Sequence, residues 1–271
     1  MGWVARAGGG AVVVTPAVVL TVAGSDSGGG AGIQADLKTF AALRTYGASV
    51  VTAVTAQNTL GVASVHGLPA EVVGAQLDAV LGDLSVLATK VGMLAAEDVA
   101  AVVVARARAG RLPNLVLDPV LTASTGRRLG VLAAIERLLP YAKVVTPNRD
   151  EATELLGWPV RTPEEMARAA AQLGSRGAEV VVVTGGDLPV ESVDAVWTER
   201  GARLMSGPHV DTGNNHGTGC TFSAAIAARL AVGDDVLDAV EFAKRYVTRA
   251  LAGGRDWKIG RGAGPLDHFG W

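Results

Sequence analysis

The chain has 271 residues, of which 49% are hydrophobic, and a formal net charge of −2. It carries no basic run or acidic tail, so the composition gives no indication of nucleic-acid binding. No stretch of 18 uninterrupted apolar residues predicts a membrane span. Its one cysteine, Cys220, excludes an internal disulfide and a cysteine cluster for zinc. We therefore expect a cytoplasmic protein that binds neither nucleic acid nor membrane.

The first residues, 1–15, are expected to form a loose extension. The apolar run over 11–23 follows Arg6 and is similar to a signal peptide, but Pro16 interrupts it and it leads directly into a glycine-rich loop. Residues 16–271 contain no long linker, repeat or low-complexity stretch. They are expected to form one domain.

Short apolar runs alternate with amphipathic stretches along this domain. The predicted strands are 18–23, 49–56, 88–91, 115–118, 143–146 and 179–184, with a late hairpin over 193–198 and 202–206. The predicted helices are 33–43, 70–84, 96–109, 131–139, 149–156, 163–176, 220–231 and 236–252. This alternation predicts an α/β fold with a mostly parallel central sheet and helices on both faces. In such sheets ligands bind beyond the carboxyl ends of the strands.

A glycine loop opens directly into a predicted helix at Gly217-Thr218-Gly219-Cys220. Glycines let the backbone turn tightly and approach a ligand. The first N–H groups of a helix have no partner within it, so together with the helix dipole they favour an anion. The loop suits a phosphoryl group, although a tight turn without a ligand explains it equally well.

A second glycine loop covers residues 24–32, between a predicted strand and a predicted helix. Its spacing meets a relaxed dinucleotide pattern, but the acidic residue expected about 20 positions later is absent. The Walker pattern also fails, because no Gly-Lys-Ser/Thr follows. We interpret this loop as a substrate lid or wall. Asp36 either points back into the pocket or is a favourable charge in the first turn of the helix.

Polar and polarisable side chains follow the next predicted strands. The amide of Gln57 offers donors and an acceptor, which suits a heteroaromatic ring with an amino group and a ring nitrogen, or the cap of a turn. Met93 either contacts such a ring or fills the core. Asp118 and Glu151 are candidate Mg²⁺ partners. Asn148 and Glu151 also fit a capping box at a helix start.

Several motifs occur together at residues 23–39, 55–59, 91–94, 117–120, 146–148, 216–220 and 264–269. With them the chain resembles the hydroxymethylpyrimidine/phosphomethylpyrimidine kinases of thiamine biosynthesis, in the ribokinase-like superfamily. The resemblance covers about residues 18–270. The first glycine loop and the Gly-Thr-Gly-Cys element are its most specific parts.

The resemblance implies a ribokinase-like kinase that uses ATP and Mg²⁺. It implies phosphorylation of 4-amino-5-hydroxymethyl-2-methylpyrimidine and then of its monophosphate, and a homodimer or higher homo-oligomer. Gln57 is expected to bind the pyrimidine, with Gly24, Asp36, Met93 and Val120 around it. Cys220 matches a position where many ribokinase-like enzymes carry a base Asp, and a helix N-terminus lowers a thiol pKa below about 8.5. Nucleotide contacts are expected from Asn148, Thr184 and Gly186, and metal contacts from Asp118 and Glu151.

The chain departs from the family pattern at two expected cations. Thr184 stands where the family often has a Lys that touches the ATP phosphates, and Gly213 stands where it usually has Arg or Lys. Two alternatives remain open: a kinase of pyridoxal or related B6 vitamers, and a non-catalytic pyrimidine-binding regulator, which the lost cations favour slightly.

Overall fold

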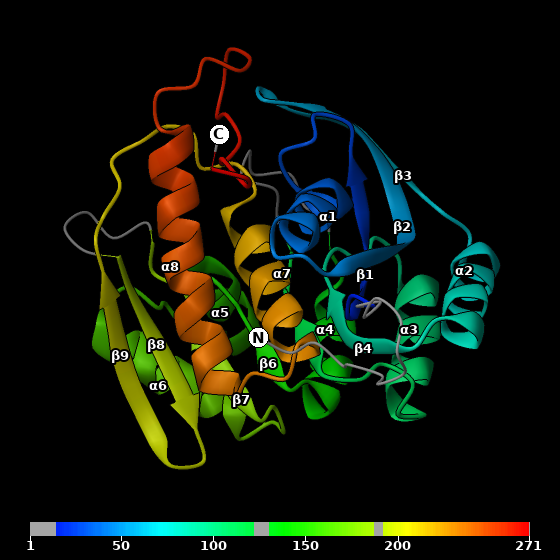
Figure 1. Ribbon diagram of the computed structural model, residues 1–271. Helices are drawn as coiled ribbons and strands as arrows, with labels where there is room; N and C mark the ends of the chain where they lie inside the picture. The colour runs from blue at the N-terminus through cyan, green and yellow to red at the C-terminus, as the bar shows by residue number, and fades with distance from the viewer. Residues whose placement is uncertain (1–14, 122–129, 187–191, 271) are drawn as a thin grey trace, which may run out of the picture.

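The computed structural model describes residues 15–121, 130–186 and 192–270 (Figure 1). The predicted extension over residues 1–15 therefore lies outside the described residues, apart from Thr15. The described part of the chain folds around one sheet, as the alternation of elements predicts.

The sheet has the strand order β3-β2-β1-β4-β5-β6-β7-β8-β9. Its strands are β1 Val18–Asp26, β2 Tyr46–Asn58, β3 Gly61–Gly67, β4 Val86–Val91, β5 Leu115–Leu117, β6 Val144–Val145, β7 Val180–Val183, β8 Ser192–Thr198 and β9 Gly201–Gly207. From β2 to β7 in this order, neighbours pair in parallel. β3 at one edge and β8 and β9 at the other pair antiparallel. The parallel strands place their carboxyl ends along one edge.

Helices cover both faces of this sheet, so the predicted α/β fold class is confirmed (Figure 1). One apolar cluster joins the sheet to α1 Gly32–Ala42, α7 Thr218–Ala231 and α8 Val236–Gly254. The other joins it to α2 Ala70–Asp83, α3 Glu97–Arg108, α4 Leu132–Leu138, α5 Arg149–Leu156 and α6 Pro163–Gly174. The predicted helices match these to within a few residues. A short 3₁₀ turn, Leu139–Tyr141, follows α4.

One strand was not predicted. β3 pairs with β2 through a tight connection at Thr59 and Leu60. None of the residues of β3 is buried. The strand therefore has no buried face to require the alternation of apolar and polar residues by which a half-buried strand is predicted. Its partner β2 is longer than the predicted strand and extends to Asn58. This extension supports Gln57 on a paired strand rather than in a loop.

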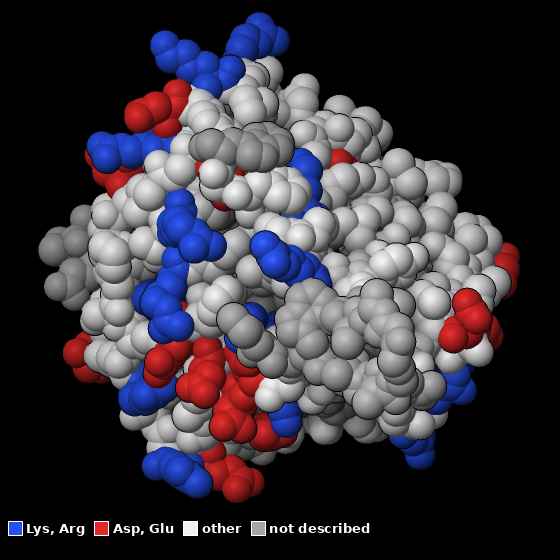
Figure 2. All heavy atoms as spheres, viewed as in Figure 1, with Lys and Arg blue, Asp and Glu red and all other residues white. Residues whose placement is uncertain are grey.

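The charged side chains on one face of the molecule are of mixed sign. In Figure 2, Lys and Arg side chains lie along the region of α8, and Asp and Glu side chains gather near its lower end, so both signs of charge occur on this face. None of the helices in the described ranges is long and apolar enough to cross a membrane.

Candidate active site

A cavity of about 460 Å³ lies at the carboxyl ends of the parallel strands and at the start of α7. Its volume is within the range of about 300–1,000 Å³ that small-molecule sites occupy. Of the residues expected at the site, those that line it are Gly24, Gln57, Met93, Val120, Asp118, Asn148, Glu151, Thr184, Gly217, Thr218, Gly219 and Cys220. Strand ends from β1 to β7 thus converge on one cavity, as expected for such sheets.

Asp26 at the end of β1 organises the first glycine loop. One carboxylate oxygen accepts a hydrogen bond from the N–H of Gly28, and the other accepts from Gly30 and Ala31, at 2.8 to 3.1 Å. That second oxygen also lies 3.0 Å from Nε2 of His216. Burial raises the pKa of Asp26, but the hydrogen bonds from His216, Ala31 and Gly28 outweigh it and lower the pKa. Asp26 is therefore an ionised carboxylate that holds the loop.

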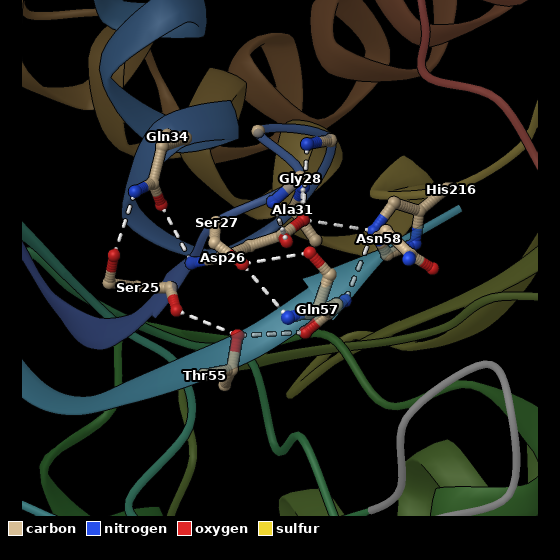
Figure 3. Close-up of polar contacts among 12 residues, drawn as sticks. Ser25, Asp26, Ser27, Gly28, Ala31, Gln34, Thr55, Gln57, Asn58 and His216 are labelled. Atoms are coloured by element: carbon tan, nitrogen blue, oxygen red, sulfur yellow. Dashed lines mark hydrogen bonds and ion pairs between the residues drawn. The ribbon is translucent and has the colours of Figure 1, made fainter. Parts of the chain in front are cut away.

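Gln57 faces this loop from β2 (Figure 3). Its side chain lies 3.2 Å from both Thr55 Oγ1 and His216 Nε2. Its backbone N–H and C=O both contact the hydroxyl of Ser27 at 2.8 Å. Met93 packs against Gly24, where a Cβ would collide with the methionine side chain. These contacts give the amide and the thioether fixed positions on one wall of the cavity.

The N-terminus of α7 forms another part of the cavity lining. Gly217 precedes the helix with a φ of 86°, a left-handed conformation that favours glycine. A Cβ at this position would also collide with the backbone of Gly30, so the two glycine loops touch. A Cβ on Gly219 would meet nothing within 4 Å, so its backbone faces open space. The first turn of α7 can therefore approach an anion closely, with the positive end of the helix dipole behind it.

Lys90 in β4 lies behind the cavity in a buried charged cluster. Its Nζ is 3.0 Å from both carboxylate oxygens of Asp36 and 3.4 Å from Asp118. Burial lowers the pKa of Lys90, but the neighbouring Asp36, Cys220 and Asp118 raise it further than burial lowers it. Lys90 therefore stays charged. Among the described residues that line the cavity, it is the one Lys or Arg.

Asp36 does not face the cavity, contrary to one of the two alternatives for it. Its side chain is fully buried and also accepts a 2.6 Å hydrogen bond from Thr21 Oγ1. Gly186 likewise lies outside the cavity lining, although Thr184 just before it is part of the lining. We infer that Asp36 supports the site through Lys90 rather than through contact with a ligand.

Glu151 lines the cavity together with Asp118 and lies in the first turn of α5. Asn148 and Glu151 form the expected capping box, with reciprocal hydrogen bonds of 2.8 and 2.9 Å. Burial and the charge of Asp118 raise the pKa of Glu151 to about 8. Within the described ranges no three His, Cys, Asp or Glu side chains are grouped for a metal ion. Mg²⁺ at a phosphate site needs only one or two carboxylates, with waters and phosphates as its other ligands, so Asp118 and Glu151 fit it.

Cys220 differs from its expected chemistry. Burial raises the pKa of its thiol to about 12, and Asp118 and Asp36 add to this effect. Lys90 and the N–H of Gly32 lower the pKa, but not enough to compensate. The expectation that the helix N-terminus brings this pKa below its free value is therefore wrong. Burial and the two neighbouring carboxylates destabilise the thiolate more than the helix dipole stabilises it.

Sequence reasoning missed three residues of the site: Lys90, Asp26 and His216. Lys90 is a charged residue inside an apolar strand, which was a usable signal. Asp26 and His216 were parts of recognised motifs, but they meet across 190 positions of sequence. His216 is oriented in turn by its backbone bond to Gly264.

The family model of phosphomethylpyrimidine kinase matches residues 26–267. The chain belongs to this family. It is 48% identical to the hydroxymethylpyrimidine/phosphomethylpyrimidine kinase of Rhizobium meliloti, over 93% of this chain and 97% of that protein. This similarity confirms the kinase family that the sequence motifs indicate.

Two solved structures are similar to this phosphomethylpyrimidine kinase family member. The phosphomethylpyrimidine kinase of Clostridium difficile is 37% identical, with a TM-score of 0.75 over 86% of this chain and 99% of that chain. The pyridoxal kinase of Staphylococcus aureus in complex with AMP-PCP and pyridoxal is 36% identical, with a TM-score of 0.86 over 95% of each chain. The ribokinase-like fold is thus shared by kinases that act on two related rings.

Proposed function

We propose that this chain transfers the γ-phosphoryl group of ATP to the hydroxymethyl oxygen of 4-amino-5-hydroxymethyl-2-methylpyrimidine. A second transfer, to the monophosphate, gives the diphosphate for thiamine biosynthesis. The observation that carries the proposal is the cavity, whose lining brings together Gln57, Met93 and the N-terminus of α7. A ring held by the first two would direct its hydroxymethyl group toward the start of the helix.

Phosphoryl transfer depends mainly on positioning and on stabilisation of charge. The amides of Gly219 and Cys220 are the groups we assign to the transferring phosphoryl group, with Gly217 and Thr218 shaping the turn. The N-terminus of α7 and the charge of Lys90 both stabilise the negative charge of the transferring phosphoryl group. Direct transfer from ATP to the hydroxymethyl oxygen needs no covalent intermediate on the enzyme.

Cys220 is the residue we assign as proton acceptor for the hydroxymethyl group. Because its pKa is raised to about 12, it begins the reaction protonated at neutral pH in most molecules. Lys90 and the N–H of Gly32 favour its ionised form. In a loose transition state the alcohol proton leaves late, so a small population of thiolate limits the rate without preventing the reaction.

The nucleotide is assigned to the side of the cavity formed by Asn148 and Thr184. The pyridoxal kinase neighbour in complex with AMP-PCP supports a nucleotide site in this fold. Carboxylates of Asp118, Asp150, Glu151 and Glu154 also line the cavity. The charges of Asp118, Asp150 and Glu154 would repel a triphosphate unless a cation lay between them, so we assign Mg²⁺ to Asp118 and to Glu151, which would ionise when the cation binds. A bound Mg²⁺ would neutralise phosphate charge.

A homo-oligomer and a cytoplasmic location remain parts of this proposal. Tyr46, Val54 and Leu60 on β2 and the turn after it are 47 to 54% exposed, and they offer an apolar surface to a second copy. Sedimentation of the purified chain tests the oligomer.

A pyridoxal kinase is the second candidate, because a pyridoxal kinase of the same fold is 36% identical to this chain. A panel of alcohols with ATP separates the two. We expect kcat/KM for the pyrimidine alcohol to exceed that for pyridoxal. A higher value for pyridoxal would favour the second candidate, and no turnover of either would favour a regulator that only binds.

A further inference from the structure

His216, Asp26 and Gln57 form a hydrogen-bonded group that joins three separate segments around the cavity (Figure 3). Asp26 ends β1, Gln57 lies in β2, and His216 comes directly before the anion loop of α7. The His216 side chain is 11% exposed and that of Asp26 is 3% exposed. The group is therefore largely shielded from water, and its hydrogen-bond pattern must be satisfied internally.

The protonation of His216 follows from Asp26. Each oxygen of the Asp26 carboxylate already accepts backbone N–H groups, and an ionised carboxylate has no hydrogen to donate. The low pKa of Asp26 agrees with an ionised group. Its 3.0 Å contact with His216 therefore requires a hydrogen on Nε2 of the imidazole.

This hydrogen decides the orientation of the Gln57 amide. The amide nitrogen lies 3.2 Å from Nε2 of His216, which would bring two donors together. A rotation of the amide by 180° exchanges its oxygen and nitrogen without changing its shape. The amide oxygen then shares the single Nε2 hydrogen of His216 with Asp26 in a three-centre hydrogen bond, and the amide nitrogen donates to Thr55 Oγ1. Thr55 can accept this bond because its own hydroxyl hydrogen goes to the backbone oxygen of Ser25 at 3.0 Å.

The glycine loops hold the imidazole in this position. A Cβ on Gly30 would collide with the ring of His216. The N–H of His216 donates to the backbone oxygen of Gly264 at 3.1 Å, and Asn214 anchors the same C-terminal segment through Gly254, Trp257 and Gly264. The ring therefore has little freedom to turn away from Asp26 and Gln57.

We propose that His216, held by Asp26, is a positioning residue that keeps the oxygen of the Gln57 amide toward the imidazole and so sets specificity for a ring with an amino group. The inference rests on the proposed function. In this orientation one lone pair of the amide oxygen remains to accept from the ring amino group. One N–H remains to donate to the neighbouring ring nitrogen.

An amide free to rotate would lose this preference. After a rotation of 180°, the amide N–H occupies the place of the amide oxygen. The amide then matches a 4-oxo ring with a protonated ring nitrogen. The specificity therefore depends on the histidine hydrogen, although His216 need not touch the ring. A role in stability alone would weaken the binding of both rings equally.

Two substitutions separate these roles. His216→Phe keeps a flat ring and removes the N–H, whereas His216→Gln keeps an N–H of similar reach. Thr55→Val removes the acceptor at the other end of the amide and leaves His216 in place. Calorimetry measures Kd for 4-amino-5-hydroxymethyl-2-methylpyrimidine and for its 4-oxo analogue in each protein. Binding of a non-hydrolysable ATP analogue and thermal unfolding are measured alongside as controls on folding.

In the unaltered chain we expect the amino ring to bind more tightly than the oxo ring. In His216→Phe and Thr55→Val the ratio of the two Kd values should fall by roughly 5- to 150-fold, the range for an unpaired buried polar group. His216→Gln should keep most of the ratio. A ratio within twofold of the unaltered value in both His216→Phe and Thr55→Val would overturn the inference and leave the proposed function standing. Failure of the unaltered chain to bind the amino ring would overturn both.

Discussion

Nζ of Lys90 lies 3.0 Å from both carboxylate oxygens of Asp36, and neither side chain is exposed to solvent. The same Nζ is 3.4 Å from Asp118, which lines the cavity. Lys90 thus lies in the lining of a cavity that also includes five Asp and Glu residues and no other Lys or Arg among the described residues. Removing one partner of a buried pair leaves a charge without compensation.

Lys90→Met should therefore lower the free energy of unfolding by about 3–5 kcal/mol, because Asp36 and Asp118 lose their shared cation. Adding Asp36→Asn should recover part of the loss. Urea unfolding measures both variants. Lys143→Met is a matched control, because Lys143 pairs with Glu179 at the surface, and it should cost about 1 kcal/mol or less. A loss for Lys90→Met as small as that of the control would contradict the account of the cluster.

Gln57→Leu should weaken pyrimidine binding by roughly 5- to 150-fold, since an unpaired polar partner costs about 1–3 kcal/mol. The affinity for ATP should change little, because Gln57 lies in β2 whereas the residues assigned to the nucleotide, Asn148 and Thr184, follow β6 and β7. Calorimetry with each ligand separately measures both effects. Unchanged pyrimidine affinity would remove Gln57 from the substrate site.

Glu151→Gln should raise the Mg²⁺ concentration needed for half-maximal rate, because the variant keeps the shape of the side chain but can no longer ionise when the cation binds. The pKa of Glu151, raised to about 8, adds a stability effect. The folded chain keeps this proton between about pH 4.5 and 8, whereas the unfolded chain loses it near pH 4.5. The free energy of unfolding therefore falls as pH rises through this window.

The variant lacks this titration, so its stability should depend less on pH between 5 and 8. Thermal unfolding across this range checks the slope, and Mg²⁺ titration of the rate checks the metal assignment. An unchanged Mg²⁺ requirement, together with lower stability, would leave Glu151 as a helix-capping residue alone.

Much of the fold could be predicted from the sequence because its strands are buried on both faces and appear as continuous apolar runs. The capping box of Asn148 and Glu151 was also readable, since both partners lie within four positions. Lys90 was not interpreted, because its partner Asp36 is 54 positions away and nothing local indicates the pair. The predicted direction of the pKa shift of Cys220 was wrong for the same reason. The local sequence shows the helix N-terminus, which lowers the pKa, but not the burial and the carboxylates, which raise it.

Cys220 should react slowly with iodoacetamide at pH 7, because its pKa is raised to about 12 and the thiolate is the reactive form. The alkylation rate should rise about tenfold per pH unit between pH 8 and 11, and turnover should also rise with pH. Cys220→Ala should lower turnover by about 10²–10⁴, the range for a positioned acid–base group, while both substrates still bind. Near-normal turnover of this variant would make the thiol a packing residue and leave catalysis to the anion loop and the cations.

The most direct test of the account is the mass of the product formed from 4-amino-5-hydroxymethyl-2-methylpyrimidine by the purified chain with ATP and Mg²⁺. We expect a species with one added phosphoryl group to form first and a species with two to follow, each matched by an equal amount of ADP. The isolated monophosphate should be converted to the diphosphate as well. Binding of the pyrimidine without any gain of a phosphoryl group would contradict the central claim that this chain is a kinase acting on this ring.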